Sequence, residues 1–218
     1  MLRILLGEDQ NSVSSAILEQ ICRNAADGKS GQILMVPEQY SHDMERTLCA
    51  VGGDSICLSA EVLSFSRLAS RVCSLYGGVS RRNLDHGGRL VAMSLAMESV
   101  GSRLKLYGVS RKKPEFLLRI LAALDEFKSA CISAEQIRRA SAGAGGQLAV
   151  KLEELALIAE SFDAVCAAMG QDSHDRLSLL CDQLDCSGYA AGRQVFILGF
   201  SDFTGRELEI IGRLLEHA

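Results

Sequence analysis

The sequence predicts an α/β fold whose parallel sheet is interrupted by an all-helical insert. Short, continuously apolar runs indicate parallel strands, because helices cover such strands on both faces. The strands that they predict lie at 2–6, 33–36, 56–58 and 194–198. Between the third and fourth runs, a chain of about a hundred residues shows helical periodicity. We therefore expect an α/β core formed by residues 1–78 and 190–218, with a helical subdomain at 79–189.

The first part of the predicted core alternates strands and helices. The strand at 2–6 precedes a polar loop and a helix whose apolar residues share one face: Val13, Ile17, Leu18 and Ile21. Pro37 ends the strand at 33–36, and another helix follows it. After the strand at 56–58, apolar residues between 63 and 76 recur at the helical period.

The predicted insert contains two long amphipathic helices and a short one. The first has a stripe formed by Phe116, Leu117, Ile120, Leu121, Leu124 and Phe127. The second covers about 148–169, and a capping box from Ser133 to Gln136 begins the short helix. The strand at 194–198 then returns the chain to the core, and a second capping box, Thr204–Glu207, begins the final helix.

Composition excludes several classes of protein. The chain has 218 residues, of which 48% are hydrophobic, and this content is typical of a globular protein rather than a disordered one. It has no apolar run long enough to span a bilayer and no signal peptide, so we expect a cytoplasmic protein without membrane contact. The eight cysteines form no C-x-x-C pair, and we therefore predict no metal site.

Positive charge is concentrated in one part of an acidic chain. The net charge is −4, yet residues 67–113 contain ten Lys or Arg against two acidic residues. A basic region on an acidic protein suits the phosphate backbone of a nucleic acid. A solvated helical surface would show the same pattern, so both interpretations stay open at this point.

The loop after the first predicted strand has the position of a phosphate loop but not its residues. The pattern G-x-x-x-x-G-K-[ST] places Gly7 at the first glycine and Ser14 at the final hydroxyl. Ser12 then replaces the second glycine, and Val13 replaces the lysine that contacts the β- and γ-phosphates. We therefore predict a degenerate nucleotide loop at Gly7, Ser12, Val13 and Ser14 that does not bind Mg-ATP tightly.

The end of the last predicted strand also lacks the chemistry of an ATPase. Such enzymes place an acidic residue there for Mg²⁺. Here the corresponding residues are Leu198 and Gly199, and Asp202 lies farther along the loop. Since two separate parts of an ATPase are absent, we predict no catalytic residues in this chain.

Four segments resemble a known family: "LRILLGEDQNS", "ILMVPEQYSHDMERTL", "VLSFSRLASRVCSLYGG" and "VFILGFSDFTGRELEIIGRLL". The chain resembles the N-terminal part of the B subunit of bacterial ATP-dependent helicase/deoxyribonucleases, the AddB/RexB type. The resemblance implies a RecA-like core of the P-loop NTPase and helicase type, with an inserted helical subdomain. It also implies a complex that resects DNA double-strand breaks for recombinational repair, in which the A subunit is the partner and motor.

The resemblance further implies that the helicase-like half of the B subunit serves DNA binding. The nuclease domain and the iron–sulfur cysteines of the family lie downstream, and no part of these 218 residues matches them. The chain is therefore expected to be an N-terminal fragment that holds no cofactor and does not cut DNA alone.

Several polar residues are candidate DNA contacts. Helicases of the type that this chain resembles contact single-stranded DNA through loop hydroxyls and basic groups, and the resemblance implies this role for Ser64, Ser66, Arg67 and Arg71. Gln39 follows a predicted strand, and Arg81 and Arg82 lie in a glycine-flanked loop at the boundary of the insert. Helix capping by the serines and solvated arginines would explain the same residues. Phe200 and Phe203 are expected to pack in the core rather than to stack on bases.

Three alternatives remain. A phospho-receiver signalling module would explain the acidic pair after the first strand, but Asp54 precedes the third strand instead of ending it. Such a module would be a free-standing α/β protein for interaction or signalling, whereas a purely helical interaction protein would leave the four predicted strands unexplained. A variant ATPase would need a lysine and an acidic residue from elsewhere in the chain.

Overall fold

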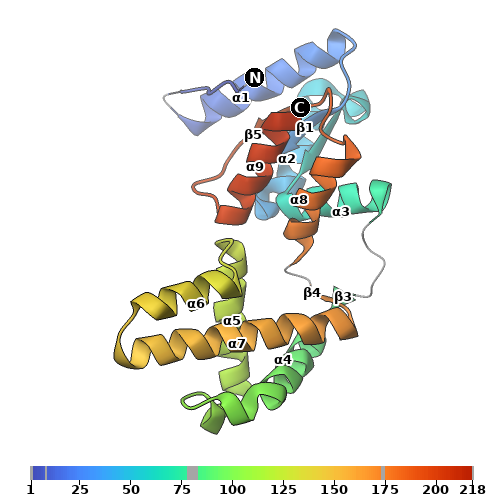
Figure 1. Cartoon of the computed structure of the whole chain (residues 1–218). Helices are drawn as coiled ribbons and strands as arrows, with labels where there is room; N and C mark the ends of the chain where they lie inside the picture. The colour runs from blue at the N-terminus through green and yellow to red at the C-terminus, as the bar shows by residue number, and fades with distance from the viewer. Residues whose placement is uncertain (1, 8, 78–82, 173–174, 218) are drawn as a thin grey trace. The chain divides into compact units, whose positions relative to one another are not determined.

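The structure, a computed structural model, describes residues 2–7, 9–77, 83–172 and 175–217. The chain divides into two compact units. Figure 1 draws the elements of both and colours them by residue number, from blue at the N-terminus to red at the C-terminus. Residues 1–78 and 176–218 form an α/β unit, and residues 79–175 form a helical unit.

The α/β unit has a parallel sheet of three strands in the order β2–β1–β5. The central strand β1 (Gln32–Met35) pairs with β2 (Ala60–Leu63) and with β5 (Gln194–Ile197). β1 is buried along its whole length, because both of its neighbours and both layers of helices cover it. The predicted α/β fold with a parallel sheet is therefore confirmed.

Two groups of helices cover the two faces of this sheet. Leu34 and Val36 pack with α1 (Gln10–Ala26) and α2 (Ser41–Gly52). Ile33 and Met35 point the other way, because successive side chains of a strand alternate between its faces. They pack with the second group of helices: α3 (Phe65–Tyr76), α8 (Arg176–Ser187) and α9 (Gly205–His217). Two short 3₁₀ helices, η1 (Glu38–Tyr40) and η2 (Asp54–Leu58), lie in the connections.

The predicted strands at 33–36 and 194–198 are confirmed as β1 and β5. The predicted strand at 2–6 is wrong: the segment forms no strand, and the side chain of Leu6 is 93% exposed. An apolar run shows that a segment suits a buried strand, but pairing also needs a partner strand that the pattern does not identify.

The predicted strand at 56–58 is also wrong. These residues belong to η2, in which Ile56 is buried while Leu58 is exposed, and the strand forms two residues later as β2. Glu61 interrupts the apolar pattern of β2, and its carboxylate reaches Arg71 at the surface. A parallel strand is predicted from a continuous apolar run, and Glu61 interrupts that run, so the pattern does not predict β2.

The helical unit consists of four main helices and a short parallel pair of strands. The helices are α4 (His86–Val100), α5 (Pro114–Ser129), α6 (Ala134–Gly143) and α7 (Gly146–Met169). The strands are β3 (Asn83–Leu84) and β4 (Gln171–Asp172), and the 3₁₀ helices η3 (Gly101–Arg103) and η4 (Gly108–Ser110) connect α4 to α5.

One apolar core holds the helical unit together. It joins Ala92, Met93, Ala96 and Met97 of α4 to the stripe of α5 and to α7. Leu117, Ile120, Leu121 and Leu124 of the predicted stripe are buried, and the predicted capping box from Ser133 to Gln136 is present. None of the helices in the described ranges combines the length and apolar character needed to span a lipid bilayer.

The position of α8 differs from the expected extent of the insert. Leu180 and Leu184 of α8 pack with Ile210 and Leu214 of α9 in the core of the α/β unit. Residues 176–187 are predicted to belong to the insert because their helical pattern continues that of the preceding residues. The division into a helicase-type core and an insert stays a prediction.

Candidate nucleic-acid interface

The carboxyl ends of the three parallel strands meet at one edge of the sheet, where open α/β sheets commonly bind ligands. Glu38 follows β1 by way of Pro37, Ser64 follows β2, and Leu198 follows β5. Two of the candidate DNA contacts, Ser64 and Gln39, therefore lie at this edge. Ser64 is buried and Gln39 is exposed.

The two candidate serines bind a glutamate. The hydroxyls of Ser64 and Ser66 both donate hydrogen bonds to Oε2 of Glu38. The Ser64 hydroxyl also caps α3 by accepting a hydrogen bond of 3.2 Å from the Arg67 amide. The hydroxyl of Ser64, and then that of Ser66, lower the pKa of Glu38 against the opposing effect of burial. The edge thus holds a carboxylate that sequence analysis missed, although it directly precedes the candidate Gln39.

The candidate arginines of α3 are already paired with carboxylates. Arg67 Nη2 lies 2.8 Å from Glu45 Oε1, and Arg71 Nη2 lies 3.0 Å from Glu61 Oε1. Both arginines are 40–48% exposed, and ion pairs of this kind contribute about 1 kcal/mol or less. A phosphate group could replace either carboxylate at little cost. Arg81 and Arg82 lie outside the described residues.

Removing both hydroxyls, as Ser64→Ala with Ser66→Ala, is expected to raise the pKa of Glu38. In the folded chain the hydroxyls favour the carboxylate, so the pKa of Glu38 lies below its value in the unfolded chain. The stabilisation is therefore complete above that value and is lost as the pH falls through the folded pKa. Carbon-detected NMR titration of the Glu38 carboxyl measures the pKa.

Ser70→Ala is the matched control, because the Ser70 hydroxyl donates to the Ser66 backbone carbonyl in the same helix. It should leave the pKa of Glu38 unchanged. An unchanged pKa in the double variant would contradict the assigned hydrogen bonds.

The residues aligned with a phosphate loop form a capped helix start. The Ser12 amide donates to Asp9 Oδ1 at 2.6 Å, and the Ser12 hydroxyl donates to the Asp9 carbonyl at 2.9 Å. The Ser12 amide is the largest cause of the lowered pKa of Asp9. A carboxylate therefore lies at the beginning of α1, where a phosphate loop would bind its anion.

Gly7 and Val13 approach each other closely. A Cβ on Gly7 would lie 2.6 Å from Val13 Cγ2, so the glycine leaves room for the valine at the position of the expected lysine. Val13 in turn packs against the core formed by α1 and α2. The structure thus gives Gly7 and Val13 packing contacts, and Ser14 lies in the first turns of α1.

The segment after β5 is apolar at its beginning. Leu198 is buried, Gly199 has a positive φ of 82°, and the carboxylate of Asp202 is within reach of the Ser201 hydroxyl at 3.3 Å. Phe200 and Phe203 stack with ring centroids 5.0 Å apart, and both pack against the core. The expectation that these rings pack in the core is confirmed.

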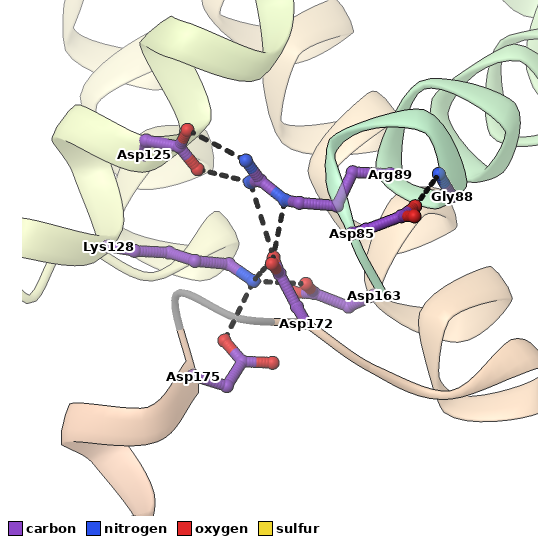
Figure 2. Close-up of polar contacts among 8 residues, drawn as sticks. All are labelled: Asp85, Gly88, Arg89, Asp125, Lys128, Asp163, Asp172 and Asp175. Carbon is purple, nitrogen blue, oxygen red and sulfur yellow. Dashed lines mark hydrogen bonds and ion pairs between the residues drawn. The ribbon is translucent and has the colours of Figure 1, made fainter. Parts of the chain in front are cut away.

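A buried ionic cluster, which sequence analysis missed, lies in the helical unit (Figure 2). Arg89 of α4 forms a two-pronged hydrogen bond with Asp125 of α5, and Arg89 Nε lies 2.7 Å from Asp172 Oδ1. Lys128 Nζ lies 3.0 Å from Asp172 Oδ2 and 2.9 Å from Asp175 Oδ1. The side chain of Asp172 is fully buried, and that of Arg89 is 7% exposed.

The cluster strongly favours the charged forms of its cations. Burial alone would lower the pKa of Lys128, but the hydrogen bond to Asp175 and the charges of Asp172 and Asp163 outweigh it and raise that pKa. Burial is the largest effect on Asp163, whose pKa is raised although Lys128 opposes the change. Within the described ranges, no group of His, Cys, Asp and Glu side chains is arranged to hold a metal ion.

The sequence of the whole chain places it among known proteins. The model of a family described as "ADDB, N-terminal" matches residues 4–218. The chain belongs to the AddB N-terminal family. The resemblance found in the sequence is therefore confirmed.

Relatives of this AddB-family chain carry the name of the B subunit of an ATP-dependent helicase/deoxyribonuclease. Those of Pelotomaculum thermopropionicum and Thermoanaerobacter sp. are 33% and 30% identical over all of this chain, and that of Geobacillus thermodenitrificans is 31% identical over 98% of it. The chain spans 19% of the length of each of these three relatives.

Proposed function

We propose that this chain is the N-terminal, DNA-handling part of the B subunit of an ATP-dependent helicase/nuclease that processes DNA double-strand breaks. The match of the AddB N-terminal family to residues 4–218 carries the proposal. The names of the relatives supply the activity, and we transfer it to the larger protein of which this chain forms part. An A subunit is the proposed partner, and the cytoplasm is the proposed location.

Within this protein, we assign no catalytic step to the chain. The α/β unit would serve as a RecA-like scaffold, and the helical unit at 79–175 would be its insert. Two observations support a degenerate nucleotide loop: the partly buried Val13 packs against the core where a lysine is needed, and the carboxylate of Asp9 caps α1. The carboxylate repels the phosphates that such a loop would bind.

The receiver-like alternative has less support. A phospho-acceptor aspartate should follow a strand, at the carboxyl edge of the sheet. Asp54 instead begins η2 and precedes β2, so it lies at the opposite end of that strand.

The chain is expected to hydrolyse ATP no faster than a blank reaction. Neither the first loop nor the end of β5 supplies a lysine or a metal-binding carboxylate at the required position. A coupled phosphate-release assay on the purified chain measures this rate. Hydrolysis that a substitution of Gly7 abolishes would contradict the proposal and favour a variant ATPase.

Arg81→Glu with Arg82→Glu is expected to weaken DNA binding by the assembled enzyme. Each lost phosphate contact reduces the dependence of log K on log salt by about 0.9 on duplex DNA, so two contacts should reduce this slope by about 2. Fluorescence anisotropy across a salt series measures affinity and slope. Arg81→Lys with Arg82→Lys keeps the charge and should keep both, and an unchanged slope in the glutamate variant would remove these residues from the interface.

A further inference from the structure

Positive charge in the helical unit is concentrated in the loop between α4 and α5. This loop, residues 101–113, contains five of the ten basic residues in the basic region and no acidic residue. They are Arg103, Lys105, Arg111, Lys112 and Lys113. We call this segment the basic loop.

Three other basic residues of the region 67–113 already interact with carboxylates in the structure. Arg67 and Arg71 are paired with glutamates, and Arg89 is buried in the ionic cluster. In contrast, the side chains of Arg103, Lys105, Lys112 and Lys113 belong to exposed residues. Among the described parts of the chain, no carboxylate lies within 4.0 Å of these four cations.

The basic loop has a defined conformation because a buried carboxylate holds its backbone. Glu154 of α7 is 4% exposed, and it accepts hydrogen bonds from three successive amides of the loop. The distances are 2.6 Å from the amide of Lys105, 2.9 Å from that of Leu106 and 2.9 Å from that of Tyr107. Because one carboxylate accepts hydrogen bonds from three successive amides, the turn is already ordered in the unbound chain.

Two further contacts tie the loop to itself. The Arg111 guanidinium donates to the Gly108 carbonyl at 2.9 Å, and the Arg111 stem lies over Gly101 so closely that a Cβ there would be 3.1 Å from Arg111 Cδ. Leu104 is buried, and the ring of Tyr107 lies 5.5 Å from that of Phe116. The apolar side chains thus anchor the loop while its cations stay in solvent.

We propose that the basic loop is a phosphate-backbone contact for DNA and that Glu154 positions it. The proposal rests on the proposed function, which brings DNA to this protein. Several positive charges close together in the sequence attract the phosphates of a duplex, which carries a negative charge about every 1.7 Å along its axis. Contacts to phosphate carry no sequence information, so we expect this contact to be independent of the DNA sequence. A preformed loop also loses less conformational entropy on binding.

The test uses the full-length B subunit assembled with its A subunit and a fluorescent 30-base-pair duplex. The loop variant combines Lys105→Glu, Lys112→Glu and Lys113→Glu. The matched control combines Arg23→Glu, Lys29→Glu and Arg46→Glu, which change the net charge equally at exposed sites of the α/β unit. Anisotropy across a salt series from about 50 to 300 mM gives Kd and its salt slope.

The loop variant should raise Kd at least about tenfold and reduce the salt slope by about 3, whereas the control should change Kd less than threefold. The Lys→Arg version of the loop variant should restore wild-type binding. Glu154→Ala, which keeps every cation, should raise Kd about threefold with a nearly unchanged slope, because the loop must then be ordered during binding.

The outcomes separate this inference from the proposed function. If the wild-type assembly binds DNA and the loop variant has the same Kd and salt slope as the control, the inference is wrong and the proposed function stands. If the wild-type assembly does not bind DNA, the proposed function fails. If the loop variant retains DNA affinity and no longer assembles with the A subunit, an acidic protein surface is the partner of the loop, and the DNA contact is overturned.

Discussion

Replacing Arg89 by methionine is expected to destabilise the helical unit by about 3–5 kcal/mol. The guanidinium interacts with Asp125 and Asp172, and the second of these carboxylates is fully buried. Removing one partner of a buried ion pair leaves its counterpart uncompensated in a medium that solvates charge poorly. Methionine preserves much of the side-chain volume, so the loss would report the charge rather than a cavity.

The remaining charges show why this effect should be large. Without Arg89, Lys128 would face the three carboxylates that Figure 2 joins to it, those of Asp163, Asp172 and Asp175, and Asp125 would lose its contact with the guanidinium. Asp172 belongs to β4, Asp125 to α5 and Arg89 to α4, so the loss would loosen three elements of the unit together. Hydrogen exchange measured by mass spectrometry resolves peptides of the helical unit from those of the α/β unit.

Arg139→Met is the matched control for this substitution. Arg139 forms an ion pair with Glu135 in α6, but their side chains are 74% and 68% exposed. Its loss should change stability by about 0.5 kcal/mol or less, since solvent screens the pair. Similar losses in both variants would show that the buried cluster does not stabilise the unit.

Glu154→Ala is expected to destabilise the helical unit by about 3 kcal/mol, because three amides of the basic loop would lose their acceptor. Hydrogen bonds to a charged group contribute about 1.5–3 kcal/mol each, and contributions within one group are not additive. The amides of 105–107 should exchange with solvent much faster in the variant. Peptide-resolved hydrogen exchange measures both effects.

Two comparisons make this prediction specific. Glu154→Gln keeps one carbonyl oxygen and should recover part of the lost stability. Glu153→Ala changes the preceding residue, which is exposed and pairs with Arg138 at 3.3 Å, and it should stay close to the wild type. Fast exchange at 105–107 in the Glu153 variant, or protection there in the Glu154→Ala variant, would contradict the assigned role of Glu154.

The sequence predicted those parts of the fold in which hydrophobic pattern and burial coincide. Residues 33–36 are apolar and pack on both faces, so their pattern identified β1 correctly. Residues 2–6 have the same pattern without a paired strand, and β2 has a pairing partner but a charged residue in its pattern. Pairing is a long-range property, and local periodicity contains no information about it.

The candidate site was predictable only in part for a related reason. The sequence identified the serines after β2, but it could not show that Glu38, which follows a different strand, accepts their hydrogen bonds. Arg89 appeared to be one of several surface cations, because its partners lie 36 and 83 residues farther along the chain. Glu154 appeared as an ordinary polar position on an amphipathic helix, and its loop partners precede it by nearly fifty residues.

The sheet joins segments that the ribosome makes at very different times. Asn24 of α1 donates hydrogen bonds to Gln32, at the start of β1, and to Gln194, at the start of β5 and 170 residues farther along. The helical unit is contiguous in sequence and can fold as soon as it emerges, whereas β1 and β2 must wait for β5. During synthesis, the central strand therefore stays unpaired on one side while the residues between Met35 and Gln194 are made.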